Sequence, residues 1–140
     1  HTLLEIVTAS CLRWLKAQEA VNGKAKRLFL LDHIPGQINP SHFEEFCIPY
    51  YKQIFSEYPN ALKIYHNENN VTKIINRIGE MGADIFQFGI DIEIAKEALG
   101  NKICLMGNLL PTGTILGSSP VAVSKEAKTC AFLLKTTETF

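Results

Sequence analysis

Short apolar runs alternate with amphipathic segments along most of this chain. Apolar residues recur at helical spacing over residues 2–21, and the compact run at residues 28–31 is typical of a buried strand. Similar runs predict strands at residues 61–65, 85–88 and 103–106. Helical patterns separate these strands at residues 41–58, 71–78 and 92–99, and a last helix is expected over residues 119–134.

Turn and capping residues refine these boundaries. Ser41 and Glu44 have the spacing of a capping box and are expected to open the helix that follows the first strand. Pro49 lies inside that helical pattern and should kink or split it, because proline has no N–H to donate. Asn69 or Asn70 is the expected N-cap of the helix at residues 71–78.

Strict alternation of helices and short apolar strands predicts an α/β fold with a parallel sheet. A parallel sheet needs cover on both faces, so it is either doubly wound or closed into a barrel. Four strands are too few to close an eight-stranded barrel. We therefore expect residues 1–140 to form a single partial domain if the fold is a (β/α) barrel.

Composition and charge exclude several classes of protein. Apolar residues make up 46% of the chain and charged residues 20%, which is typical of a globular protein. The 14 basic and 14 acidic residues balance, which argues against nucleic-acid binding. No segment is apolar enough to span a membrane and no polybasic run would bind its surface. The four widely spaced cysteines favour buried thiols of a cytoplasmic protein over a disulfide framework.

Polar residues gather where the predicted strands end. In parallel α/β folds, ligands bind at the carboxyl ends of the strands. The residues at these ends are Asp32 and His33, then His66, Asn67, Glu68, Asn69 and Asn70, then Gly89 and Asp91, and finally Gly107 and Asn108. This distribution makes the strand ends the candidate functional site.

His66 and Glu68 are the strongest candidates. Residues two apart at the end of a strand can point the same way and bind a metal ion together or act as an acid–base pair. The alternative is structural: His66 would be a hydrogen-bonded rim residue and Glu68 would be solvated. The Asp32 carboxylate could equally accept a hydrogen bond from the backbone of its own turn. Glu45, in the first turn of a helix, could simply be stabilised by the helix dipole.

Two segments of the chain resemble a known family. Residues 32–54, DHIPGQINPSHFEEFCIPYYKQI, look like the "D..G..lsP..f.eF..Py.k.i" segment of the uroporphyrinogen decarboxylase superfamily. Residues 81–89 and 91–108 are similar to its later "tGAD...ld...di..ak..lGdkv.l.GNldP" block. The resemblance implies a TIM barrel of which this chain is the C-terminal half, with the remainder of the barrel as its first partner.

The superfamily has two main chemistries, and the resemblance implies one of them. One is cofactor-free decarboxylation of the acetate arms of uroporphyrinogen; the other is zinc-dependent methyl transfer from a corrinoid (methylcobalamin) protein to a thiol or similar acceptor. In the methyltransferases a strand-end His, a Cys two residues later and a further Cys later in the chain typically bind zinc. His66 matches the first of these ligands, but Glu68 stands in place of the Cys.

We expect zinc-dependent methyl transfer, with a corrinoid protein or a small methyl donor or acceptor as partner. Zinc would be bound by His66 together with Glu68, Glu45 or Asp32. Catalysis would fall to Asp32, His66 and Glu68, and substrate binding to His33, Asn67, Asn70 and Asn108.

The alternative reaction is decarboxylation of uroporphyrinogen, in which Asp32 would help to orient the pyrrole nitrogens and no cofactor would be needed. Two positions depart from the decarboxylase pattern: Gly89 stands where that enzyme's strand tends to end in Asp, and Leu110 replaces the Asp of its "GNLDP". An inactive or binding-only fragment is the third possibility.

Overall fold

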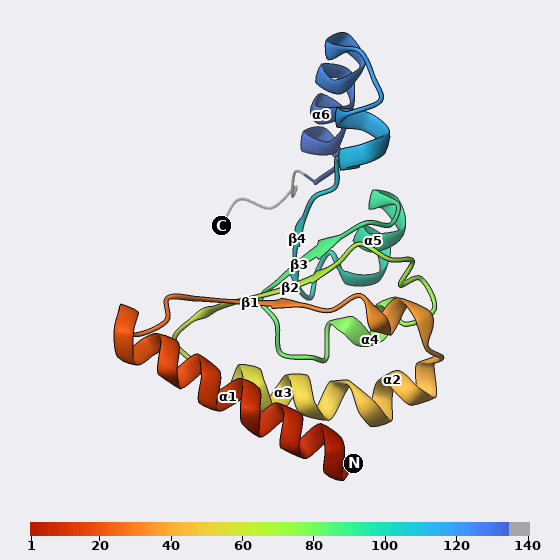
Figure 1. Ribbon diagram of the computed structural model, residues 1–140. Coiled ribbons are helices and arrows are strands. Elements are labelled where there is room, and N and C mark those ends of the chain that lie inside the picture. Colours follow the sequence, from red (N-terminus) through yellow and green to blue (C-terminus); the bar gives the residue numbers. More distant parts are fainter. Residues whose placement is uncertain (135–140) are drawn as a thin grey trace.

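The computed structural model describes residues 1–134 as a four-stranded parallel sheet with helices along it (Figure 1). The sheet order β1-β2-β3-β4 follows the sequence, so each helical connection leads to the neighbouring strand. The strands are β1 (Arg27–Leu31), β2 (Leu62–Asn67), β3 (Ile85–Phe88) and β4 (Cys104–Met106). The predicted parallel α/β fold is confirmed, and the four strands leave the barrel unclosed in this chain.

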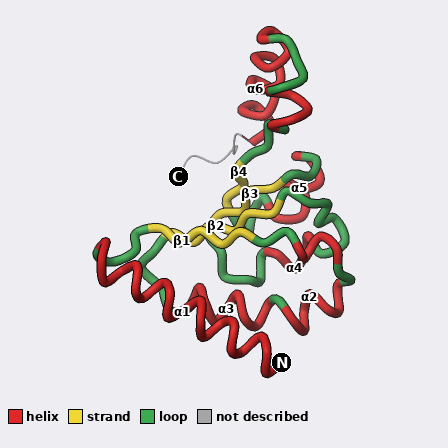
Figure 2. Tube along the Cα trace, viewed as in Figure 1, coloured by secondary structure: helices red, strands yellow, loops and turns green. Residues whose placement is uncertain are grey.

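The helices gather mainly on one side of the sheet, as Figure 2 shows for the red segments below the yellow strands. They are α1 (Thr2–Asn22), α2 (Pro40–Phe46), α3 (Ile48–Ser56), α4 (Ile75–Ile78), α5 (Ile92–Leu99) and α6 (Pro120–Leu134). A 3₁₀ turn, η1 (Ile34–Gln37), follows β1, and a π-helical turn, η2 (Pro111–Ile115), precedes α6. Helix α6 extends away from the sheet (Figure 1).

The two faces of the sheet differ because successive strand residues point to opposite sides. Tyr65 and Phe86 face the helices, are fully buried, and stack with ring centroids 5.5 Å apart. On the other face, Phe29 and Leu31 are 44% and 66% exposed and Met106 is 37% exposed. In a TIM barrel this second face points into the barrel, so its open state here matches an incomplete barrel.

Two expected helix starts are wrong. Asn39, not Ser41, caps α2: its side chain accepts a hydrogen bond from the His42 N–H at 2.8 Å, and Pro40 occupies the first helical position. Proline fixes the backbone for a first turn, so the helix begins earlier than expected.

Pro49 does divide the long helical pattern, since α2 ends at Phe46 and α3 begins at Ile48.

The segment after β2 also differs from the expectation. Strand β2 continues through His66 and Asn67, and α4 is a single turn that begins only at Ile75. Neither Asn69 nor Asn70 caps it, because each holds a loop instead: Asn70 Oδ1 accepts a hydrogen bond from the Thr72 N–H at 3.1 Å, and Asn69 reaches across to β1's loop. A longer loop therefore lies at this strand end.

The four cysteines are free, which agrees with the expectation that they form no disulfide framework. The expected burial is wrong for two of them, since Cys11 and Cys104 are exposed and only Cys130 is buried. Cys104 lies on the open sheet face, where it pairs in register with Ile85, and this position explains its exposure. Among the described helices, none is both long and apolar enough to cross a membrane.

Candidate functional site

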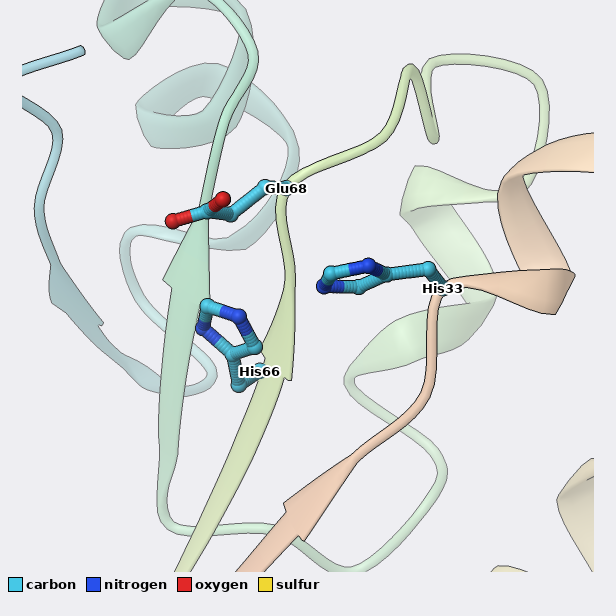
Figure 3. A group of neighbouring side chains, drawn as sticks. All are labelled: His33, His66 and Glu68. Atoms are coloured by element: carbon cyan, nitrogen blue, oxygen red, sulfur yellow. The ribbon is translucent and has the colours of Figure 1, made fainter. Parts of the chain in front are cut away.

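Three side chains meet at the carboxyl edge of the sheet: His33, His66 and Glu68 (Figure 3). Each offers one nitrogen or oxygen atom, and these atoms lie within 4.8 Å of one another. The register explains the meeting, because Leu31 at the end of β1 pairs with His66 in β2. His33 lies two residues after Leu31, and Glu68 lies two residues after His66. Both side chains therefore reach the same region of the carboxyl edge.

His66 is the buried member of this trio, with 9% of its surface exposed. Its Nδ1 lies 2.7 Å from the side-chain oxygen of Gln87 on β3. The His66 ring lies 5.2 Å from the His33 ring and 6.0 Å from the Phe29 ring, centroid to centroid. The imidazole is thus oriented by its neighbours and points to the open face of the sheet.

Amide side chains hold the loops that carry the other two members. The Asn69 amide donates to the His33 carbonyl at 2.8 Å, and the Asn69 N–H donates to Asn67 Oδ1 at 2.9 Å. Asn67 is fully buried and donates in turn to the Tyr65 hydroxyl at 3.0 Å. The structure therefore gives Asn67, expected to bind substrate, a positioning role in the loop around Glu68.

Asp32 lies at the same edge but its carboxylate is engaged elsewhere. One oxygen accepts the Ile34 N–H at 2.9 Å, and the other accepts the hydroxyl of Tyr51 from α3. Burial, followed by the hydrogen bond to Asp32, raises the pKa of the Tyr51 hydroxyl above its usual value. Burial likewise raises the pKa of the Tyr65 hydroxyl, which donates to the Asp32 backbone carbonyl at 3.3 Å. This arrangement ties β1 to the helical layer.

Gly89 brings β3 unusually close to the loop that contains Glu68. A Cβ atom at position 89 would lie 2.2 Å from the Glu68 carbonyl oxygen. No real side chain tolerates that distance, so an Asp at this position, as in the decarboxylase pattern, is incompatible with the observed path of the β2–α4 loop. The glycine noted in the sequence therefore fits this close approach.

The remaining predicted residues lie outside the trio. The Glu45 carboxylate pairs with the His1 imidazole at 3.3 Å on the surface. This contact does not involve the other proposed zinc ligands. Asn70 lines a shallow hollow of about 260 Å³ together with Thr72, Gly89 and Asp91. Asn108 donates to the Ile90 carbonyl, which joins the β4 end to the loop after β3.

The trio has two chemical capacities. Two imidazole nitrogens and a carboxylate oxygen are ligands that zinc accepts, and a catalytic zinc commonly has three protein ligands and an open position. Without a metal, imidazole and carboxylate groups placed this close together can donate and accept protons.

Comparison with known proteins identifies the family. The model of the uroporphyrinogen decarboxylase (URO-D) family matches residues 1–137, almost the entire chain. The chain belongs to the URO-D family. The resemblance found in residues 32–54 and 81–108 is thereby confirmed at the level of the family.

Curated URO-D proteins align with most of this chain. It is 31% identical over 119 residues to uroporphyrinogen decarboxylase from Trichodesmium erythraeum, an alignment that covers 81% of this chain and 33% of the relative. The identity is 29% over 133 residues to the enzyme of Chlorobium luteolum, with 91% and 36% covered. It is 28% over 131 residues to uroporphyrinogen decarboxylase 2, chloroplastic, of Arabidopsis thaliana, with 89% and 32% covered. The chain thus spans about a third of the length of these relatives.

Proposed function

We propose that His33, His66 and Glu68 form part of the reaction centre of a URO-D family enzyme. The observation that supports this is their convergence at the carboxyl edge of a parallel sheet, where (β/α) barrels place their active sites. The rest of the barrel would supply further residues around the open face. Two reactions compete for this centre, and each has its own support.

Decarboxylation of uroporphyrinogen is the reaction that the relatives favour, and we place it first. The relatives named above are called uroporphyrinogen decarboxylase. In this reaction the bond between an acetate methylene and its carboxylate breaks, CO₂ leaves, and a proton takes its place on the carbon. A general acid is needed, and protonated His33 or His66 could supply the proton. Asp32 is less suited to the role that we expected for it, because both carboxylate oxygens are already hydrogen-bonded.

Zinc-dependent methyl transfer is the second candidate, and the geometry of the trio favours it. A cofactor-free decarboxylase has no need of two histidines and a carboxylate that can share one ion. The glycine at position 89, enforced by contact with Glu68, also departs from the decarboxylase pattern. Here His66, Glu68 and His33 would bind zinc, with His33 in place of Glu45. The zinc would act as a Lewis acid toward the methyl acceptor, and a corrinoid protein would supply the methyl group.

Metal content and turnover of the full-length protein separate the two reactions. Decarboxylation predicts conversion of uroporphyrinogen that chelators leave unchanged. Methyl transfer predicts about one zinc per protein, and methylcobalamin-dependent methylation of a thiol that chelation abolishes. In both cases His66→Gln should remove the activity, whereas the same change at the exposed His42 should not. A full-length protein that performs neither reaction would support the third possibility, a binding-only member of the family.

A further inference from the structure

Among the described residues, Gln87 is the side chain within hydrogen-bond distance of the His66 imidazole. The register places Leu31, His66, Gln87 and Met106 side by side in one row that crosses all four strands. Leu31 and Met106 offer no strong hydrogen-bonding group. The 2.7 Å contact between Gln87 Oε1 and His66 Nδ1 is therefore the polar contact within this row that can orient the imidazole.

This contact has a chemical consequence for the ring. A neutral imidazole has one N–H and one nitrogen lone pair, and the partner of one nitrogen decides which is which. The Gln87 oxygen can only accept a hydrogen bond, so Nδ1 must carry the hydrogen. The lone pair then resides on Nε2. In Figure 3 the second ring nitrogen of His66 faces the space between His33 and Glu68.

We propose that Gln87 is a positioning residue that holds His66 in its Nδ1–H tautomer, with the Nε2 lone pair directed at His33 and Glu68. The role of this tautomer in a reaction rests on the function proposed above. In methyl transfer, Nε2 would be the zinc ligand, and outer-shell partners of ligating histidines commonly have this role. In decarboxylation, Nε2 would be the atom that takes up and delivers the proton.

The tautomer can be observed directly in the full-length protein. We would label the histidine rings with ¹⁵N, remove metal with a chelator, and record long-range ¹H–¹⁵N correlation spectra near neutral pH. The expected spectrum shows His66 with a protonated Nδ1 and an unprotonated Nε2. Gln87→Met, which has a similar length but no carbonyl oxygen, should lose this preference, whereas Gln87→Glu, which keeps an acceptor, should retain it.

Matched variants separate positioning from general stability. Gln53→Met makes the same change on the exposed surface of α3 and should leave the His66 spectrum unchanged. The urea unfolding midpoint reports whether each variant is folded. If the protein binds zinc, Gln87→Met should also weaken zinc binding by about 10- to 100-fold, and Gln87→Glu should restore most of it.

Two results would overturn this proposal. One is a wild-type His66 with the hydrogen on Nε2, which would mean that the Gln87 amide donates rather than accepts. The other is an unchanged tautomer in Gln87→Met. Failure of the proposed function looks different: His66→Gln would keep full activity and metal content, while the Nδ1–H tautomer would still be present in the wild type.

Discussion

Replacement of Gly89 by alanine tests the close approach between β3 and the loop that contains Glu68. The added Cβ would lie 2.2 Å from the Glu68 carbonyl oxygen and 2.8 Å from both its carbonyl carbon and its Cα. All three contacts are with backbone atoms, so no change of rotamer can relieve them. The β2–α4 loop or the end of β3 must move instead.

The expected cost follows from the kind of contact. Overpacking a tight site typically costs about 1–3 kcal/mol, and contacts this short with backbone atoms place Gly89→Ala at the upper end. The reduced freedom of the unfolded chain offsets about 0.4–1 kcal/mol of this. We therefore expect the free energy of unfolding to fall by roughly 2 kcal/mol, and the displaced Glu68 should weaken any function of the trio.

Gly113→Ala is the matched control. A Cβ at position 113 would lie 3.5 Å from the Leu110 Cβ, which is ordinary van der Waals contact. This variant should be as stable as the wild type or more stable by up to about 1 kcal/mol. Urea unfolding of the full-length proteins gives both values. Ordinary surface substitutions change the free energy of unfolding by up to about 0.5 kcal/mol. If the value for Gly89→Ala lies this close to that of the wild type, the close approach between Gly89 and the Glu68 loop is wrong.

Three further predictions concern the hydrogen-bond network and the open face. Tyr51→Phe removes the hydroxyl that donates to Asp32 and should cost about 1.5–3 kcal/mol at neutral pH. Because the pKa of Tyr51 is raised in the folded state, the stability that it contributes is complete below about pH 10, the unfolded value, and is lost as the pH rises further. The variant should therefore lose less stability between about pH 10 and about pH 11 than the wild type does in urea unfolding; an equal loss would contradict the buried phenol. Asn67→Ala breaks the links to Tyr65 and to the Asn69 N–H, and should lower the unfolding free energy by roughly 2 kcal/mol; an unchanged urea midpoint would mean that the loop does not depend on Asn67. The 140-residue chain alone should self-associate through its open apolar face, and Leu31→Lys should reduce this in light scattering; a monodisperse monomer of the unmodified chain would contradict the expectation.

The sequence was sufficient for the fold because its signals were local and repeated. Four short apolar runs with helical patterns between them predict a parallel sheet, and each run became a strand. The helix starts were less predictable. Ser41 and Glu44 match a capping box, yet the Asn39-Pro40 pair two residues earlier forms a better first turn.

The site was predictable only in part, because register cannot be read from a single strand. His66 and Glu68 stand together in the sequence, and the strand-end rule was enough to single them out. His33 joins them through the pairing of β1 with β2, and Gln87 contacts His66 through the pairing of β2 with β3. Once the order and register of the parallel strands are known, aligning the strand ends residue by residue identifies both His33 and Gln87 as neighbours of His66.

Glu45 shows the opposite case. It is a candidate ligand in the sequence because a carboxylate can complete a mixed His/carboxylate zinc site. The structure places it beside His1 on the surface of the helical layer. The sequence alone gave no indication of this contact, because His1 and Glu45 are 44 residues apart and meet only in the folded chain.

We propose that the trio at the sheet edge is part of a reaction centre, in which His66 is the buried member. The most direct measurement is kcat/KM of the full-length His66→Gln variant, for uroporphyrinogen decarboxylation or for methylcobalamin-dependent thiol methylation, whichever the wild type performs. We predict a fall of about 100-fold or more, the scale at which a general acid contributes, with the unfolding midpoint retained and His42→Gln fully active. A His66→Gln variant as active as the wild type would contradict the claim.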